Sequence, residues 1–188
     1  MQRACFSNLW HGVWLVMLSL ALVPLDSYSA GPDSAEYKLK AALIYKLTGF
    51  IEWPKSSLKG RKFGICVLGR DDFGDALDAL EARRVGNQTI HVRRFVQSEA
   101  VDAASCQILF VSESKRPFLR TILHSLAHYP ILTIGDVKQF AESGGMIEFV
   151  RGYKRIGFKI NLQQASKAGL KISAPLLDLS TIVDTAQP

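Results

Sequence analysis

The sequence is poor in the residues that build reactive sites. It contains three cysteines and four histidines in 188 residues, and no two cysteines form a CxxC pair. These scarcities argue against a zinc site and against thioredoxin-like chemistry. No GxSxG elbow occurs, and no acid and histidine in the sequence point to a particular nucleophile, so a hydrolase triad lacks support. We therefore expect a binding protein with neither a metal nor a cofactor.

Long apolar runs are also scarce, and the one that occurs lies near the N-terminus. Arg3 precedes an uncharged stretch at 13–23, and small residues follow it. This is the pattern of a secretory signal peptide, and the stretch is shorter than the roughly 20 residues that a membrane span needs. We predict cleavage after Ser29, which leaves an exported periplasmic domain at 30–188 with no membrane span. A retained signal anchor is the alternative for residues 1–29.

Runs of like charge are absent, although the protein is basic. Removing the leader deletes Arg3 and Asp26, so 23 basic and 17 acidic residues become 22 and 16, and the net charge stays at +6. A basic surface suits nucleic acid, anionic lipid headgroups or an acidic protein patch. Export argues against nucleic acid as a partner. The densest cluster, Arg151, Lys154 and Arg155, is interrupted, which favours a solvated face.

The cysteine count changes with export. Cys5 leaves with the leader, so Cys66 and Cys106 remain in a compartment where thiols oxidise. Pairing is the default expectation, and closing a loop of about 40 residues would stabilise the fold by about 4 kcal/mol in the chain-entropy model. Two separately buried free thiols are the alternative, since both cysteines lie in apolar runs.

Apolar periodicity predicts helices that alternate with strands. Helical spacing marks three segments: 34–50, which Asp33 and Glu36 would cap, a segment through Leu77 and Leu80, and 117–128. Apolar runs predict strands at 63–69, 88–95, 106–112 and 130–136. This alternation predicts a single three-layer α/β domain with a mostly parallel central sheet and helices on both faces. After Gly145, the runs MIEFV, RGYK and RIGFKINL predict a C-terminal antiparallel hairpin.

Candidate catalytic groups should lie at the carboxyl ends of the strands. Asp71 and Asp72 follow the first strand and could bind a divalent cation, as in phosphate-accepting receiver domains. That chemistry also needs an aspartate after a central strand, where this chain has Ser112 and Glu113. We expect the two aspartates to cap the following helix instead. His124 and His128 are four residues apart on a helix, but they point away from its apolar stripe and have no third ligand.

Four runs of the sequence resemble one family. They are YKLKAALIYKLTGFIEWP at 37–54, FGICVLGRDDFGDAL at 63–77, ILTIGDVKQFAESGGMIEFV at 131–150 and RIGFKINLQQASKAGLKISAPLLDL at 155–179. Together they resemble the YfiR family of exported bacterial proteins. The last run is the most specific, because its phenylalanine, asparagine, glycine and serine positions fall in register with the family pattern.

The resemblance implies a function and a disulfide. It implies a periplasmic, non-catalytic α/β protein that represses a membrane-bound diguanylate cyclase by binding its periplasmic sensor region, which would lower cyclic di-GMP and biofilm formation. Related sensor proteins are other possible partners, and a homodimer is a fair default. A disulfide role carries over to Cys66 and Cys106. Some relatives carry a second cysteine pair where this chain has Gly145, Met146 and Tyr153, so redox switching through that pair is in doubt here.

The end of the chain reads as a strand followed by two helices. GFKINL is expected to be the last strand, with Asn161 tying its end to a neighbouring loop, and Gly169 is expected to stop a short helix in the left-handed conformation. Ser173 should cap a C-terminal helix with an apolar face that includes Leu176 and Leu179.

Two surfaces are candidates for partner binding. One is the hairpin tip, with Arg151, Tyr153, Lys154 and Arg155, because Arg and Tyr are favoured interface anchors. The other is the part of the C-terminal helix that carries Leu177 and Ile182. A periplasmic small-molecule binding module of another sensor system is the alternative function, and it would need a pocket near Phe73 and Ser112.

Overall fold

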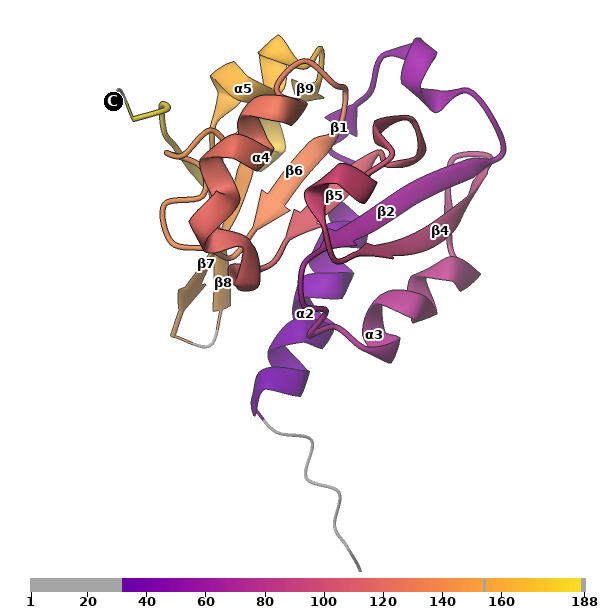
Figure 1. Cartoon of the computed structure of the whole chain (residues 1–188), viewed down its shortest axis with the longest axis horizontal. Coiled ribbons are helices and arrows are strands. Elements are labelled where there is room, and N and C mark those ends of the chain that lie inside the picture. Colours follow the sequence, from indigo (N-terminus) through magenta and orange to yellow (C-terminus); the bar gives the residue numbers. More distant parts are fainter. Residues whose placement is uncertain (1–31, 154, 187–188) are drawn as a thin grey trace, which may run out of the picture. The chain divides into compact units, whose positions relative to one another are not determined.

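An eight-stranded sheet forms the centre of the protein (Figure 1). The computed structural model describes residues 32–153 and 155–186, and the predicted leader lies outside them. The strand order is β10-β8-β7-β6-β5-β2-β4-β3. Their bounds are β2 Lys62–Leu68, β3 Arg84–Val85, β4 Gln88–Phe95, β5 Ile108–Val111, β6 Leu132–Gly135, β7 Ile147–Gly152, β8 Arg155–Ile160 and β10 Ser180–Ile182. The five neighbouring strands from β7 to β4 are mutually parallel, as predicted.

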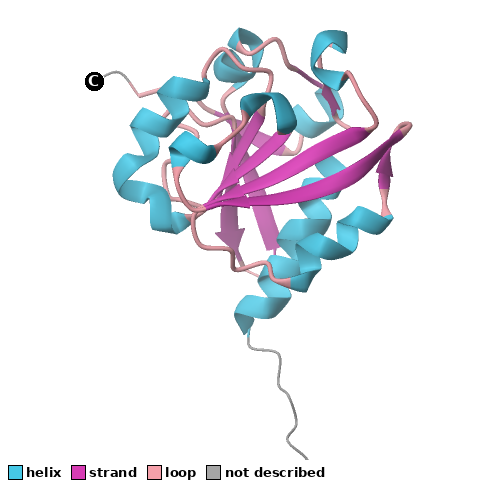
Figure 2. Cartoon of the chain, turned by 45° about the vertical axis from the view of Figure 1, so that its right-hand side comes forward, coloured by secondary structure: helices cyan, strands magenta, loops and turns pink. Residues whose placement is uncertain are grey.

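Helices cover both faces of this sheet, which confirms the three-layer prediction (Figure 2). Successive side chains of a strand point to opposite faces. Phe63, Ile65 and Val67 accordingly pack with α2 (Pro32–Leu47) and α3 (Asp75–Asp78), whereas Cys66 and Leu68 pack with α4 (Leu119–Leu126) on the other face. No helix in the described part of the chain is long and apolar enough to cross a membrane.

The helix bounds differ from the predicted ones where turns intervene. α2 begins at Pro32, so Asp33 lies inside the helix and not before it, and α2 ends three residues before Phe50 in a hydrogen-bonded turn. The segment through Leu77 and Leu80 divides into α3 and a 3₁₀ turn at Ala79–Ala82. Gly74 is the N-cap of α3, so the prediction that Asp71 and Asp72 cap it was wrong.

Both edges of the sheet contain strands that the sequence did not reveal. β3 pairs antiparallel with β4 through Arg84 and Val85 at one edge. At the other edge the hairpin of β7 and β8 is present as predicted, but β10 lies beyond it, parallel to β8. A separate two-stranded sheet joins β1 (Ile51–Glu52) to β9 (Lys171–Ile172). GFKINL is therefore not the last strand.

The predicted C-terminal helix begins at the predicted position but is much shorter than expected. α6 spans only Ala174–Leu177, and the chain then turns into β10. Ser173 is the N-cap residue of α6, as predicted, but its hydroxyl forms no capping hydrogen bond and is buried without a hydrogen bond to the described residues. Leu179 is 74% exposed rather than packed, because it lies in the turn between α6 and β10 and not on the helical stripe on which its burial was predicted.

Asn161 occupies the junction that the sequence predicted. It is fully buried, and its amide nitrogen donates to the Ala141 carbonyl at 3.0 Å and to the Thr185 hydroxyl at 2.9 Å. Its side-chain oxygen accepts from the Gln164 amide, which caps α5 (Leu162–Lys167). Gly169 then ends this region with a φ of +75°, a conformation that costs glycine little. The polar residues here are structural.

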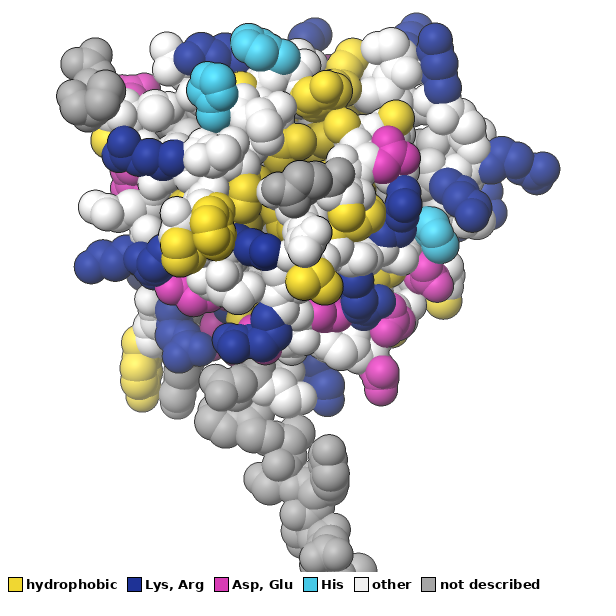
Figure 3. Space-filling model, viewed as in Figure 1, with side chains coloured by type: hydrophobic (Ala, Val, Ile, Leu, Met, Phe, Trp, Pro, Cys, Tyr) yellow, Lys and Arg dark blue, Asp and Glu magenta, His cyan; other side chains and the backbone are white. Residues whose placement is uncertain are grey.

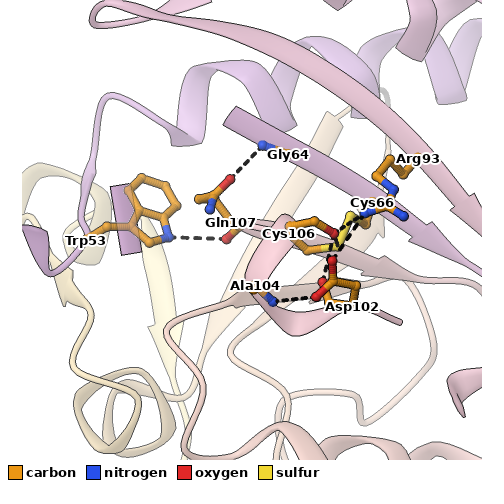
Figure 4. The surroundings of a disulfide bond; sticks show 9 residues. Trp53, Gly64, Cys66, Arg93, Asp102, Ala104, Cys106 and Gln107 are labelled. Carbon is orange, nitrogen blue, oxygen red and sulfur yellow. Dashed lines mark hydrogen bonds and ion pairs between the residues drawn. A yellow bond between two sulfur atoms is a disulfide. The ribbon is translucent and has the colours of Figure 1, made fainter. Parts of the chain in front are cut away.

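Cys66 and Cys106 form a disulfide between β2 and the segment that leads into β5 (Figure 4). Both cysteines are buried against α4. Beside them, Gln107 accepts from the Gly64 amide at 2.6 Å and donates to the Ser57 carbonyl at 3.0 Å. A Cβ on Gly64 would lie 1.8 Å from the Ser105 carbonyl oxygen, so this close approach of two backbones requires glycine.

Removal of the disulfide should destabilise the protein without changing its fold. The double variant Cys66→Ala/Cys106→Ala should lose about 4 kcal/mol of unfolding free energy, because its unfolded chain no longer carries a closed loop. Urea denaturation of the oxidised protein and of the variant would measure this difference. The reduced wild-type protein is the control and should match the variant. Equal stability of the oxidised and reduced proteins would contradict a stabilising role.

Candidate functional site

A cleft of about 580 Å³ opens at the carboxyl edge of the sheet, and we call it the carboxyl-edge cleft. After β2 the chain forms β4, which neighbours β2 on one side within the sheet. It then crosses back to form β5, which neighbours β2 on the other side. Such a change of direction leaves a crevice beyond the strand ends where α/β proteins bind ligands. The lining side chains come from α2, the strand ends and the hairpin: Ser34, Glu36, Tyr37, Lys40, Arg70, Asp72, Glu113, Asp136, Phe149, Arg151 and Ile156.

A buried lysine forms the floor of this cleft. Lys40 is only 4% exposed, and its ammonium group lies 2.5 Å from Asp136 Oδ2 and 2.7 Å from Glu36 Oε1. The same group lies 4.3 Å from the centre of the Tyr37 ring. Burying an ammonium group is costly unless carboxylates and hydrogen bonds compensate for lost water. The pair with Asp136 therefore holds helix α2 and the end of β6 at a fixed spacing, while the pair with Glu36 lies within α2.

Tyr37 shares its hydroxyl between two carboxylates. The oxygen lies 3.2 Å from Asp136 Oδ2 and 3.4 Å from Asp72 Oδ2, but a single hydroxyl proton can be donated to only one of them at a time. Burial and the two negative charges raise the pKa of Tyr37 well above its usual value, so the phenol stays protonated. The other oxygen of Asp136, Oδ1, is buried and has no hydrogen-bond partner among the described residues.

Glu36 connects the cleft floor to the hairpin. Its carboxylate pairs with Lys40 through one oxygen and with Arg151 of β7 through the other. Burial alone would raise the pKa of Glu36, but hydrogen bonds and charge attraction from Lys40 and Arg151 lower it overall. The carboxylate is therefore ionised at neutral pH, and it links α2, the floor and the hairpin in one chain of ion pairs.

The structure brings one of the predicted binding residues into this cleft and leaves others apart. Arg151 lines it, while Tyr153 at the hairpin tip is 87% exposed and Arg155 is also exposed. Lys154 lies outside the described residues. The predicted charge cluster at the tip therefore borders the cleft.

Leu177 and Ile182 do not join the hairpin tip. Leu177 is half-buried against the core. Ile182 is 48% exposed on β10 and lies opposite Ile160, at the far end of β8 from Arg155. At about 3.3 Å per residue, the five steps along β8 separate these ends by about 17 Å. The two predicted surfaces are thus distinct.

The residues that form the floor were not predicted from the sequence. Lys40 lies on the same helical stripe as the buried Ile44 and Leu47, so a charge on an apolar face was the available signal. Asp136 directly follows the buried strand β6. His124 on α4 and His128 in the turn that follows it line a different groove, and the described residues contain no group of three metal-ligating side chains.

Neutralising Glu36 should destabilise the protein in a pH-dependent way. Because its native pKa is lowered, ionised Glu36 stabilises the fold fully above the unfolded-state pKa of about 4.3 and progressively less as the pH falls through the native pKa. Glu36→Gln should therefore lose about 1 kcal/mol of unfolding free energy at neutral pH, a value already reduced for solvent screening, and less in acid.

Urea denaturation across the acid range would measure this difference. Glu113→Gln is the matched control, since Glu113 lines the same cleft but forms an exposed pair with Arg116. It should change the unfolding free energy by about 0.5 kcal/mol or less. A loss for Glu36→Gln that stays constant down to low pH would contradict the ion-pair explanation.

One known protein family matches most of the described chain. The match covers residues 37–181, which include the cleft floor, the disulfide, the hairpin and most of β10. The extent of the match agrees with the resemblance that the four sequence runs indicated. The chain belongs to the YfiR/HmsC-like family.

Proposed function

We propose that the protein is a non-catalytic periplasmic regulator that represses a membrane-bound diguanylate cyclase by binding its periplasmic sensor region. Family membership over residues 37–181 carries this proposal. The result of binding would be lower cyclic di-GMP and less biofilm. The disulfide of Cys66 and Cys106 supports a location in an oxidising compartment.

The electrostatics of the carboxyl-edge cleft favour recognition over catalysis. A general base at neutral pH needs a pKa near 7, but the pKa of Glu36 is lowered by its cationic partners. A general acid has the same requirement, and the pKa of Tyr37 is raised instead. Opposite charges that are paired in this way fix the shape of the cleft. We assign the cleft and its hairpin to partner binding.

The hairpin tip is the most exposed part of this surface. Tyr153 combines a large ring with a hydroxyl and is 87% exposed, and Arg155 stands beside it. Phe118 and Val96, which are 62% and 77% exposed, follow other strands at the same edge of the sheet. Aromatic and arginine side chains carry a large share of binding energy in protein interfaces. The carboxyl edge therefore offers both apolar and charged anchors to a partner.

A small-molecule binding module of another sensor system is the second candidate. The cleft volume lies in the range of about 300–1,000 Å³ that is usual for ligand sites. The unsatisfied oxygen of Asp136 is the observation that favours this function. The cleft differs from the predicted pocket in that Phe73 and Ser112 are buried and do not line it. Stabilisation by a compound in a thermal screen would support this candidate.

Deleting the gene should raise cellular cyclic di-GMP. A copy that keeps residues 1–29 should restore the low level, whereas a copy without them should not, because repression would require export. Mass spectrometry of cell extracts would measure the nucleotide. An unchanged level on deletion would contradict the repressor function and would move the small-molecule module to first place.

Hairpin variants extend the same assay to the surface. Tyr153→Ala/Arg155→Glu keeps the Arg151–Glu36 pair, so the fold should be unaffected while cyclic di-GMP rises toward the level of the deletion strain. Arg120→Glu is the control, because it makes the same change in net charge at an exposed residue that does not line the carboxyl-edge cleft. Loss of one large anchor typically weakens binding about tenfold or more. Full repression by the hairpin variant would remove the hairpin from the interface.

A further inference from the structure

The opposite edge of the sheet carries a concentration of positive charge. The segment KSSLKGRK at 55–62 leads into β2 and contains four cationic residues and no acid. Lys55, Lys59, Arg61 and Lys62 are all exposed, and none of them forms an ion pair with another described residue. Figure 3 shows Lys and Arg side chains gathered in the upper right of the molecule, where Figure 1 places this segment.

Lys59, Arg61 and Lys62 line a groove of about 410 Å³, which we call the amino-edge groove. Its other lining side chains come from β4 and from the segment before β5. The lining consists of Lys59, Gly60, Arg61, Lys62, Gly64, His91, Arg93, Ala104, Ser105 and Gln107. Four of these residues carry a positive charge and none is acidic, whereas four carboxylates line the carboxyl-edge cleft. The two edges of the sheet therefore differ in electrostatic character.

Two acids pair with residues that line this groove, and a third, Glu52, pairs with a residue that does not line it. Asp102 lies 3.6 Å from Arg93, Glu81 lies 3.2 Å from His91, and Glu52 lies 4.0 Å from Lys171. Arg93 is also held by the Ser105 hydroxyl and stacks 5.0 Å from the centre of the Phe95 ring. The charges of Lys59, Arg61 and Lys62 therefore remain uncompensated within the described part of the chain.

The groove is preorganised by the contacts around the disulfide. Gln107 joins the backbones of Ser57 and Gly64, and the disulfide fixes the segment that carries Ser105 against β2 (Figure 4). A cationic site whose backbone is already ordered loses less entropy when it binds an anion. The groove is thus built as a stable surface of one charge sign.

A second groove beside it adds an aromatic side chain. This neighbouring groove shares Lys59, Ala104 and Gln107 with the first and extends to Tyr129. Tyr129 is 49% exposed. Tyrosine is enriched where protein meets the headgroup region of a bilayer, and each Lys or Arg near an anionic bilayer contributes about 1 kcal/mol of attraction. Clustered cations beside an exposed tyrosine fit such a surface.

We propose that the amino-edge groove binds the phosphate groups of anionic phospholipids and holds the protein on the membrane. The inference takes from the proposed function only the export of the chain, which places lipid headgroups, and not nucleic acid, within its reach. Lipid binding at the amino edge would direct the carboxyl edge and its hairpin away from the bilayer. A repressor held in this way would meet the sensor region of a membrane protein with its hairpin outermost.

Vesicle co-sedimentation of the purified exported protein tests this inference. Vesicles of equal parts phosphatidylcholine and phosphatidylglycerol should bind the protein, and vesicles of phosphatidylcholine alone should not. Binding should weaken as salt rises from about 0.01 M to about 0.15 M, because the Debye length falls from about 30 Å to about 8 Å. Lys59→Glu/Arg61→Glu/Lys62→Glu should reduce binding at least about tenfold.

A charge-matched variant separates the groove from net charge. Arg120→Glu/Lys138→Glu/Lys167→Glu makes the same change in net charge at exposed residues that line neither amino-edge groove, and it should retain most of the binding. Circular dichroism would confirm that both variants are folded. Equal losses in the two variants, or no binding of the wild-type protein to anionic vesicles, would overturn the inference.

A competition experiment distinguishes a groove that binds lipid headgroups from one that binds a soluble anion. At equal ionic strength, inorganic phosphate should displace the protein from vesicles no better than chloride does. Stronger displacement by phosphate would show that the groove prefers a free anion and would overturn the lipid assignment. None of these outcomes depends on cyclic di-GMP, so failure here leaves the repression assay unaffected.

Discussion

The buried ion pair between Lys40 and Asp136 is the interaction on which the carboxyl edge depends. It joins the first helix to the end of a central strand, and Glu36 extends it to the hairpin through Arg151. Breaking a buried pair by removing one partner typically costs about 3–5 kcal/mol, because the remaining charge is left without compensation. The network thus fixes the position of the hairpin relative to the sheet. Any binding surface that includes the hairpin therefore depends on this network for its geometry.

The two edges of the sheet present different chemistry for a physical reason. Parallel strands place all their carboxyl ends on one side, so the loops after β2, β5 and β6 contribute Asp72, Glu113 and Asp136 to a single cleft. Their negative charges are balanced by cations from α2, β7 and the loop after β2. The amino edge collects the segment that leads into β2, where cations have no acidic partners among the described residues. One edge is therefore electrostatically balanced and the other is basic.

The sequence predicted the central architecture because burial on both faces leaves a clear signal. The strands around Ile65, Leu109 and Ile134 are continuous apolar runs, and the hairpin and the Asn161 junction were also predicted correctly. β10 was missed because its three residues follow a stretch with helical spacing, and pairing with β8 decides its conformation. The cleft floor was missed because the role of Lys40 depends on its ion pair with Asp136, which lies 96 residues away in the sequence.

The most direct test of a recognition surface at the carboxyl edge is photocrosslinking in living cells. A benzophenone amino acid would replace Tyr153 at the hairpin tip or, in a comparison strain, Tyr129, which is also exposed. The account predicts a covalent adduct from position 153 with a membrane protein that carries a GGDEF domain, and little adduct from position 129. No adduct at position 153, or equal adducts from both positions, would contradict the assignment of the hairpin to the partner interface.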